Sequence, residues 1–332
     1  MTQNSGYMVA AAMRDEGAFL LEWVCWFRML GFDRILVATN ECSDHSEQML
    51  DLLADAGWLA HVRHSPSPDT PPKKSAHAAI RAHPMVAETE WLLICDVDEF
   101  LVLHEGDGTI QGFLGDDPKG FRGIAFHWKV FGSAGEIDWH DTLVHRHFTR
   151  CATEHHKANA SFKSLFRWPL GFRRFNAHSP GGFRGDWGVD DNILIDSSGR
   201  TLGYYNPNHR PQMATSADRV THMAAQMNHY LVRCPESFGL KAGKPSPSAG
   251  VNRYTPEFLD INDRNEETDN SALSYGDRFD EIHAQALELP GLARLHHLCC
   301  ADYVSRLAGL TGADPAQDTR YIRHMDLAAS MT

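Results

Sequence analysis

Residues Trp91 to Leu103 read WLLICDVDEFLVL, an apolar run interrupted by three acids. The run has no helical spacing and contains neither glycine nor proline, which predicts a strand buried on both faces inside a parallel sheet. The acids Asp96, Asp98 and Glu99 stand where this strand should leave the sheet. Because side chains alternate along a strand, we expect Asp96 and Asp98 to point to one side and Glu99 to the other.

Two carboxylates at the end of a buried strand are costly unless a positive charge accompanies them. Mg²⁺ and Mn²⁺ prefer oxygen ligands and often take one or two carboxylates together with substrate phosphates. We therefore expect Asp96 and Asp98 to bind Mn²⁺ or Mg²⁺. The alternative is a strand end with solvated acids. An EF-hand calcium loop is excluded, because Leu101 stands where that loop needs glycine.

The residues before this run alternate between strand and helix patterns. Strands are expected at 7–13, 33–39 and 58–64, and helices at 18–30, 45–56 and 73–90, the last interrupted at Pro84. This order predicts a parallel, doubly wound α/β sheet. In such sheets ligands bind outside the carboxyl ends of the strands, so the turns at 14–16, 40–44 and 96–99 should meet in one crevice. Asp44 and Glu47 have the spacing of a helix N-cap and its capping partner.

The pattern changes after residue 108. Alternating residues predict a two-faced strand at 124–130 and a hairpin at 193–205. A loop rich in Pro, Ser and Gly at 244–250 is a candidate mobile lid. Helical spacing returns at 279–289 and 292–307, which predicts two C-terminal helices.

Composition excludes several classes of protein. The 332 residues carry a net charge of −12 and contain no basic stripe, so no nucleic-acid partner is expected. No apolar run approaches the roughly 18 residues of a membrane span, and residues 1–6 do not have the pattern of a signal peptide. The seven cysteines form no CxxC motif, which predicts reduced thiols in a cytoplasm. The pair Cys299-Cys300 is interpreted as core packing within a helix.

Short segments in the first hundred residues resemble a known family. Arg14-Asp15-Glu16, Leu21-Glu22-Trp23 and Leu30-Gly31-Phe32-Asp33 resemble the KNE…EW…LG signature of the family-2-like group of GT-A glycosyltransferases. Arg-Asp replaces the Lys-Asn of that signature, which keeps a cation in the turn. The run from Asp96 to Phe100 resembles the DxD element of the same enzymes.

The resemblance extends over about residues 7–275 and implies a GT-A-type fold with a doubly wound, mostly parallel sheet. It implies a Rossmann-like nucleotide-sugar-binding half at 1–110, a mixed α+β acceptor and catalytic half at 111–275, and C-terminal helices at 276–332. The implied activity is metal-dependent, inverting transfer of a sugar from a nucleoside diphosphate sugar, such as a UDP-sugar, to a glycan or lipid-linked acceptor. The metal on Asp96 and Asp98 would act as a Lewis acid on the leaving diphosphate.

The resemblance also implies roles for particular residues. His229 would be a third metal ligand, with His178 competing for that role. Asp269 would be the general base, with Glu266 and Glu267 behind it. The expected nucleotide-sugar-binding residues are Arg14, Glu16, Asn40, Asp44, Asp96 and Lys241.

A purely structural role stays open for several of these residues. Helix capping would account for Asp44, solvation for Lys241, and hydrogen bonding to neighbours for His178 and His229. The acidic segment around Asp269 would then be a polar loop.

Two other functions stay open. Haloacid-dehalogenase-type phosphotransferases also end an apolar strand with DxD and use the first Asp, here Asp96, as nucleophile. These enzymes have Thr or Val at the position that Phe100 occupies here. Their motif also usually stands at the start of the domain, whereas three βα units precede it in this chain. The other alternative is a non-catalytic protein that binds a nucleotide sugar or carbohydrate. A cytoplasmic location, with peripheral contact to the inner face of a membrane, is the expectation that accompanies a role in polysaccharide assembly.

Overall fold

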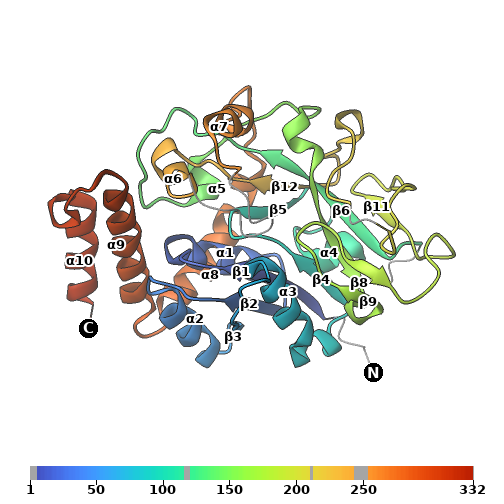
Figure 1. Cartoon of the computed structure of the whole chain (residues 1–332), viewed down its shortest axis with the longest axis horizontal. Coiled ribbons are helices and arrows are strands. Elements are labelled where there is room, and N and C mark those ends of the chain that lie inside the picture. Colours follow the sequence, from blue (N-terminus) through green and yellow to red (C-terminus); the bar gives the residue numbers. More distant parts are fainter. Residues whose placement is uncertain (1–5, 116–119, 210–211, 243–252, 332) are drawn as a thin grey trace.

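The computed structural model describes residues 6–115, 120–209, 212–242 and 253–331. Its centre is a 9-stranded sheet in the order β3-β2-β1-β4-β8-β6-β12-β5, with β11 paired to β6 (Figure 1). One half of the sheet is parallel and consists of β3 (Ala60–Arg63), β2 (Arg34–Thr39), β1 (Tyr7–Met13) and β4 (Trp91–Ile94). The parallel arrangement expected for the first hundred residues is confirmed.

Helices cover both faces of this parallel half. On one face lie α1 (Gly17–Met29) and α2 (Ser46–Asp55), and on the other lies α3 (Pro72–Ala82). Side chains of β1 alternate between the two apolar clusters, with Val9 in the cluster of α1 and Met8 in the cluster of α3. The sheet is therefore doubly wound.

The other half of the sheet is mixed. β8 (Phe162–Arg167) is antiparallel to both β4 and β6 (Gly123–Val130), and so joins the two halves. β12 (Ala225–His229) and β11 (Leu194–Asp196) are each parallel to β6, while β5 (Glu99–Leu103) is antiparallel to β12. The expected class, an α/β fold with a doubly wound, mostly parallel sheet and a mixed second half, is confirmed.

The prediction of a single strand at 91–103 is wrong. β4 ends at Ile94, and a tight turn, in which the Glu99 N–H donates to the Asp96 carbonyl oxygen (3.0 Å), reverses the chain. β5 then runs beside β12, separated from β4 by three other strands. Both pieces are apolar and buried, so local pattern did not reveal that they belong to opposite halves of the sheet.

Shorter elements connect the strands. The expected interruption at Pro84 is confirmed, because α3 ends at Ala82 and a 3₁₀ helix follows. The remaining short elements are η1 (Pro84–Glu88), α4 (Ile110–Leu114), α5 (Val144–His147), β7 (Arg150–Cys151), η2 (Lys157–Ala160), η3 (Pro169–Gly171), β9 (Phe172–Arg174), β10 (Gly181–Phe183), η4 (Ala217–Arg219), α6 (Pro235–Gly239), α7 (Pro256–Asn262), β13 (Glu267–Thr268), η5 (Ser271–Tyr275) and η6 (Pro315–Gln317). The lid expected at 244–250 lies outside the described residues.

Three helices end the chain: α8 (Gly276–Leu287), α9 (Leu292–Thr311) and α10 (Thr319–Ser330). The first two were expected, and α10 was not. α9 packs on α1 and α2, and α10 packs on α9 at one end of the molecule (Figure 1). The described residues include no helix long and apolar enough to cross a bilayer. One apolar cluster runs through all three expected segments, and their boundaries at 110 and 275 stay predictions.

Candidate functional site

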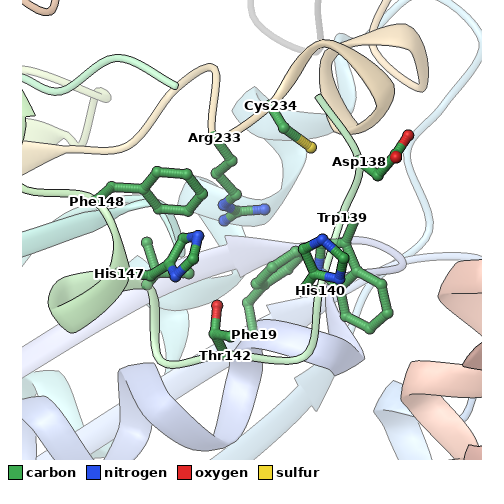
Figure 2. Close-up of a pocket in the computed structure, with 10 residues that line it drawn as sticks. Phe19, Asp138, Trp139, His140, Thr142, His147, Phe148, Arg233 and Cys234 are labelled. Atoms are coloured by element: carbon green, nitrogen blue, oxygen red, sulfur yellow. The ribbon is translucent and has the colours of Figure 1, made fainter. Parts of the chain in front are cut away.

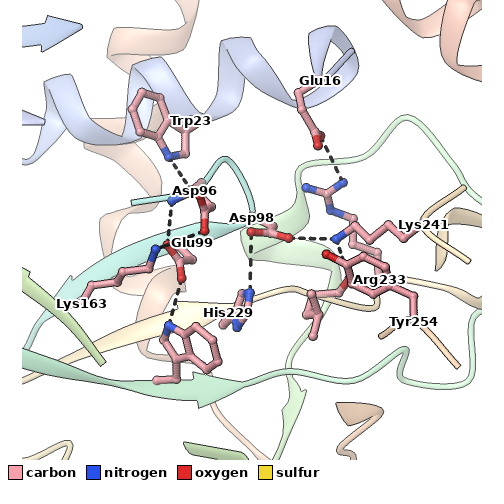
Figure 3. Close-up of polar contacts among 12 residues, drawn as sticks. Glu16, Trp23, Asp96, Asp98, Glu99, Lys163, His229, Arg233, Lys241 and Tyr254 are labelled. Atoms are coloured by element: carbon pink, nitrogen blue, oxygen red, sulfur yellow. Dashed lines mark hydrogen bonds and ion pairs between the residues drawn. The ribbon is translucent and has the colours of Figure 1, made fainter. Parts of the chain in front are cut away.

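The acidic turn between β4 and β5 lies at the carboxyl end of β4, and Lys163 and Lys241 point at it (Figure 3). The Asp96 carboxylate accepts from Lys73 Nζ of α3 at 2.5 Å and from Lys163 Nζ of β8 at 3.1 Å. Burial opposes the charge of Asp96, but Lys163 and Lys73 outweigh it and lower its pKa. Asp96 is therefore an ionised carboxylate with a cation on each oxygen.

Glu99 joins the same cluster from the first position of β5. Its Oε2 lies 2.9 Å from Lys163 Nζ and accepts from the Asp96 N–H at 2.6 Å, while its Oε1 accepts from Trp128 Nε1 at 2.9 Å. The expectation that Glu99 points away from Asp96 is thus wrong, because residues 95–98 form a turn in which strand alternation does not apply. Burial raises the pKa of Glu99.

Asp98 has different partners from Asp96. Its Oδ2 lies 3.0 Å from Lys241 Nζ, and its Oδ1 lies 3.6 Å from His229 Nε2 on β12. Burial opposes the charge of Asp98, but Lys241 and His229 hold its pKa well below its usual value. The structure therefore brings three expected site residues, Asp98, His229 and Lys241, to one place.

A divalent cation fits the Asp98–His229 side of the turn better than the Asp96 side. Both oxygens of Asp96 are engaged by lysines, whereas Asp98 Oδ1 and His229 Nε2 face each other at a distance too long for a good hydrogen bond. The other ring nitrogen of His229, Nδ1, is buried with no hydrogen-bond partner among the described residues. This geometry leaves Asp98 and His229 as the residues able to share an ion.

His178 lies near the cluster but is engaged elsewhere. Its Nδ1 hydrogen-bonds to the Phe162 carbonyl oxygen at 2.9 Å, and its ring packs against Trp128 with centroids 5.4 Å apart. Burial, helped by Lys163, lowers the pKa of His178 to about 3. This histidine is therefore a neutral ring held by the backbone.

The turns after β1 and β2 are tied together by Asp44. Its Oδ2 accepts from the Gly17 N–H at 3.1 Å and its Oδ1 from the Ser46 N–H at 3.0 Å. The expected capping pair with Glu47 is wrong, because α2 begins at Ser46 with His45 at the N-cap position. Glu47 instead bonds to the Thr39 hydroxyl and Arg63 on the neighbouring strands.

Asn40 and Glu16 lie on the same two turns as Asp44. Asn40 is 5% exposed, and its Nδ2 is buried with no partner among the described residues. Glu16 Oε2 lies 4.0 Å from Arg233 Nη1, and burial raises the pKa of Glu16. Arg14 is different: its side chain is 53% exposed, 3.7 Å from Glu41, so the structure does not bring it to the buried cluster.

Arg233 connects the cluster to a small pocket (Figure 2). Its guanidinium lies over the Phe19 ring at 3.4 Å from the centroid and points into the pocket, with His147 and Phe148 on one side. The loop at 138–142 forms the opposite wall of the pocket. The sequence did not point to Arg233 as a site residue, although Arg233 lies close after the expected ligand His229 in the chain.

Lys73, Lys163, Glu99 and Trp128 were also missing from the expected site. Lys163 carried the clearest signal, because a lysine next to Phe162 in a buried strand needs a buried partner. Trp128 and Lys129 are neighbours in the buried strand β6. Because side chains alternate between the two faces of a strand, only Trp128 points toward the turn. The partners of these side chains could not be read from the sequence.

Asp269 lies away from this site. Its carboxylate accepts from Gln226 Nε2 at 2.9 Å and from the Ser271 N–H at 2.8 Å. Gln226 and His229 are three residues apart on β12 and therefore face opposite sides of the sheet. The neighbouring acids pair locally, Glu267 with Lys129 and Glu266 with Arg264. The structure thus does not bring the expected base and its two neighbours to the acidic turn.

No protein-family model matches this chain. Two plant proteins are similar over about a third of it: a glycosyltransferase family 92 protein of Ricinus communis, 30% identical over 98 residues (30% of this chain, 17% of the relative), and one of Oryza sativa subsp. japonica, 27% identical over 106 residues (32% and 18%). Both relatives are named glycosyltransferases. This chain matches less than a fifth of the length of each. Their family, 92, differs from the family-2-like group suggested by the motifs.

Solved structures of S. aureus TarS are distantly similar. The crystal structure of TarS 1-349 has 11% identity and a TM-score of 0.30, with 98% of this chain and 92% of that chain covered. The same fragment in complex with UDP has 10% identity and a TM-score of 0.35 over the same shares.

Proposed function

We propose that this protein is a glycosyltransferase that moves a sugar from a nucleoside diphosphate sugar, such as a UDP-sugar, to a glycan or lipid-linked acceptor. The observation that carries the proposal is the buried acidic turn at the carboxyl end of β4, with Lys73, Lys163, Lys241 and Arg233 around it. The names of the two plant relatives support the same class of reaction.

The cations suit a diphosphate leaving group. Negative charge grows on the diphosphate as the glycosidic bond breaks, and fixed positive charge stabilises that state more than the ground state. Lys241 is best placed for this role, since it contacts the Asp98 carboxylate and the Leu231 carbonyl oxygen and its side chain is partly exposed. Lys163 is fully buried between Asp96 and Glu99, so its role is to hold the turn.

A divalent cation, Mn²⁺ or Mg²⁺, would be held by Asp98 and His229, with the donor diphosphate providing further oxygens. When bound, it would supply Lewis-acid stabilisation of the leaving group. Asp96, whose oxygens face two lysines, would orient the turn and the donor. This assignment departs from the sequence expectation that Asp96 and Asp98 share the ion.

The nucleoside would lie over the turns after β1 and β2. Asn40 offers a buried amide N–H that has no partner among the described residues and can donate to a base or ribose oxygen. Glu16 and Asp44 flank the same edge, and Arg14 could reach a donor only from the surface. Asp269 could act as the general base of an inverting reaction only if its carboxylate broke its hydrogen bonds to Gln226 and Ser271 and moved to the acidic turn. A different group is therefore the better candidate for the base.

The decisive experiment is a panel of UDP-, GDP- and dTDP-sugars, with release of the nucleoside diphosphate measured in the presence of Mn²⁺ and of a chelator. We expect Mn²⁺-dependent release from one donor class and its loss in Asp98→Asn, while Asp55→Asn on the far end of α2 serves as the matched control. Tight donor binding by the wild type without turnover towards any acceptor would favour the non-catalytic alternative. A covalent phosphoaspartate on Asp96 would favour the phosphotransferase.

A further inference from the structure

A second cluster of metal-binding side chains lies between the loop at 138–142 and the C-terminal helices. It is remote from the acidic turn in the sequence and on different elements. Cys300 and His324 are almost completely buried, at 0% and 2% exposure. The cluster consists of Asp141 from the loop, His296, His297 and Cys300 from α9, and His324 from α10.

The donor atoms form two groups that share Asp141, one with His296 and His297 and the other with Cys300 and His324. His296 Nε2 lies 3.4 Å from Asp141 Oδ1 and 3.6 Å from Cys300 Sγ, and His324 Nε2 lies 3.9 Å from Asp141 Oδ2. Donor atoms of Asp141, Cys300 and His324 all lie within 4.8 Å of one another. Tetrahedral zinc with ordinary Zn–N, Zn–O and Zn–S bonds places its ligand atoms about 3.3–3.8 Å apart.

Hydrogen bonding explains the cluster less well. The two His–Asp distances exceed the 2.7–3.2 Å typical of an N–H···O bond. His296 Nδ1 is also buried without a hydrogen-bond partner among the described residues. Hydrogen bonding accounts for the contact between His296 and Cys300, but the two His–Asp distances leave room for an ion.

The helices preorganise these side chains. His296 and Cys300 are four residues apart on α9 and therefore lie on one face, one turn above the other. His297 Nδ1 lies 3.1 Å from His324 Nδ1. With the proton on His324 Nδ1, this contact fixes the ring so that the Nε2 lone pair faces Asp141, as outer-shell partners of metal-bound histidines do.

The charge states of the cluster also suit a cation. Burial lowers the pKa of His324 to about 4, so its imidazole is neutral and can act as a ligand at pH 7. Burial opposes ionisation of Asp141, but the neighbouring histidines bring its pKa to about 2. Burial raises the pKa of Cys300, so zinc would have to displace the thiol proton.

We propose that Asp141, His296, Cys300 and His324 bind one Zn²⁺ in a structural site, with His297 as the outer partner of His324. Nitrogen, sulfur and carboxylate oxygen are the ligands zinc takes in proteins, and four protein ligands make a closed, structural site. A pocket lined by Glu22, Asp141, His283 and His296 gives access from the surface.

The site would fasten the C-terminal helices to the wall of the candidate active site. The loop that carries Asp141 also carries Trp139, which packs against Tyr303 of α9 with ring centroids 5.0 Å apart. The same loop lines the pocket beside Arg233 (Figure 2). Zinc would thus hold this wall in place without taking part in the reaction.

The test measures zinc in the untagged 332-residue chain after loading with ZnSO₄ and dialysis, by mass spectrometry of the metal. We expect about one zinc per chain in the wild type, in Asp98→Asn and in the surface control His155→Gln, and loss of zinc in His324→Gln. The Asp98→Asn variant separates this site from the cation site at the acidic turn. Equal zinc in the wild type and His324→Gln would overturn the proposal, as would absence of zinc from the wild type.

A second readout covers the case in which His324→Gln does not fold. Co²⁺ replaces zinc in tetrahedral sites and gives a thiolate-to-cobalt absorption band when a cysteine is bound. We expect this band in the wild type and its loss in Cys300→Ser, whereas Cys42→Ser should keep it. A band that persists in Cys300→Ser would show that the thiolate comes from elsewhere and would contradict the assignment.

Discussion

Lys163 Nζ lies 2.9 Å from Glu99 Oε2, and neither side chain is exposed to solvent. The same ammonium also contacts Asp96, so a single lysine from β8 holds the two ends of the turn between β4 and β5. Removing one partner of a buried ion pair leaves an uncompensated charge, which costs far more than the pair itself contributes. The acidic turn therefore depends on a residue more than sixty positions away in the sequence.

We expect Lys163→Met to lower the free energy of unfolding by about 3–5 kcal/mol, because Asp96 and Glu99 would lose their shared cation. Urea denaturation followed by circular dichroism measures this change. The exposed Lys74→Met on α3 is the control and should change stability by less than about 0.5 kcal/mol. Similar stabilities for the two variants would mean that Lys163 is not needed to balance the turn.

Asp98→Asn and His229→Gln should each weaken the Mn²⁺-dependent part of UDP binding at least about tenfold, since even residues that merely orient a ligand are worth 10–100-fold in metal affinity. Calorimetric titration with UDP, with and without Mn²⁺, separates this part from direct contacts. Asp96→Asn should lower stability instead, because it disturbs the contacts to Lys73 and Lys163. Metal-dependent binding that survives in both Asp98→Asn and His229→Gln would place the ion elsewhere.

Asp269→Asn should keep kcat within about tenfold of the wild type, whereas loss of a general base costs about 10²–10⁴-fold. Its carboxylate bonds to Gln226 and Ser271 on the far side of β12, so the expected effect is a loss of about 1–3 kcal/mol of stability. Turnover and thermal unfolding of the same preparation decide between the two outcomes. A large fall in kcat with unchanged stability would restore the role expected from the sequence.

Stability should fall as the pH drops from about 6.5 to 4. Burial lowers the pKa of His127 to about 4, below its unfolded value near 6.5. The unfolded chain therefore binds the proton first, so this histidine favours unfolding across that window, by at most about 3 kcal/mol. The variant His127→Gln keeps a polar group for the Thr215 hydroxyl. Urea denaturation at pH 7, 6 and 5 should show that this variant loses less unfolding free energy than the wild type as the pH falls. The exposed His155→Gln should follow the wild type, and an unchanged slope in His127→Gln would contradict the assignment.

Local patterns in the sequence determined much of the fold. Apolar runs and helical spacing placed β1 to β4 and α1 to α3, because each pattern depends on neighbours within a few residues. Because each pair of successive strands is joined by a helix, the strands form a parallel sheet. The polar turns that follow the strands then all lie at the carboxyl edge of that sheet. Asp98, Asn40, Asp44 and Glu16 were placed at that edge on this reasoning alone.

Only the tertiary structure decided which partners those residues meet. The run at 91–103 breaks into two strands because β5 finds its hydrogen-bond partner in β12, more than a hundred residues later. That pairing sets which side of β12 faces the turn, and so brings His229 to Asp98 and turns Gln226, with Asp269, away. The cluster around Asp141 likewise draws on a loop and two helices that are not adjacent in sequence. Such contacts depend on which strands and helices pack against one another. A one-residue shift in the register of a strand would move each of its side chains to the opposite face of the sheet.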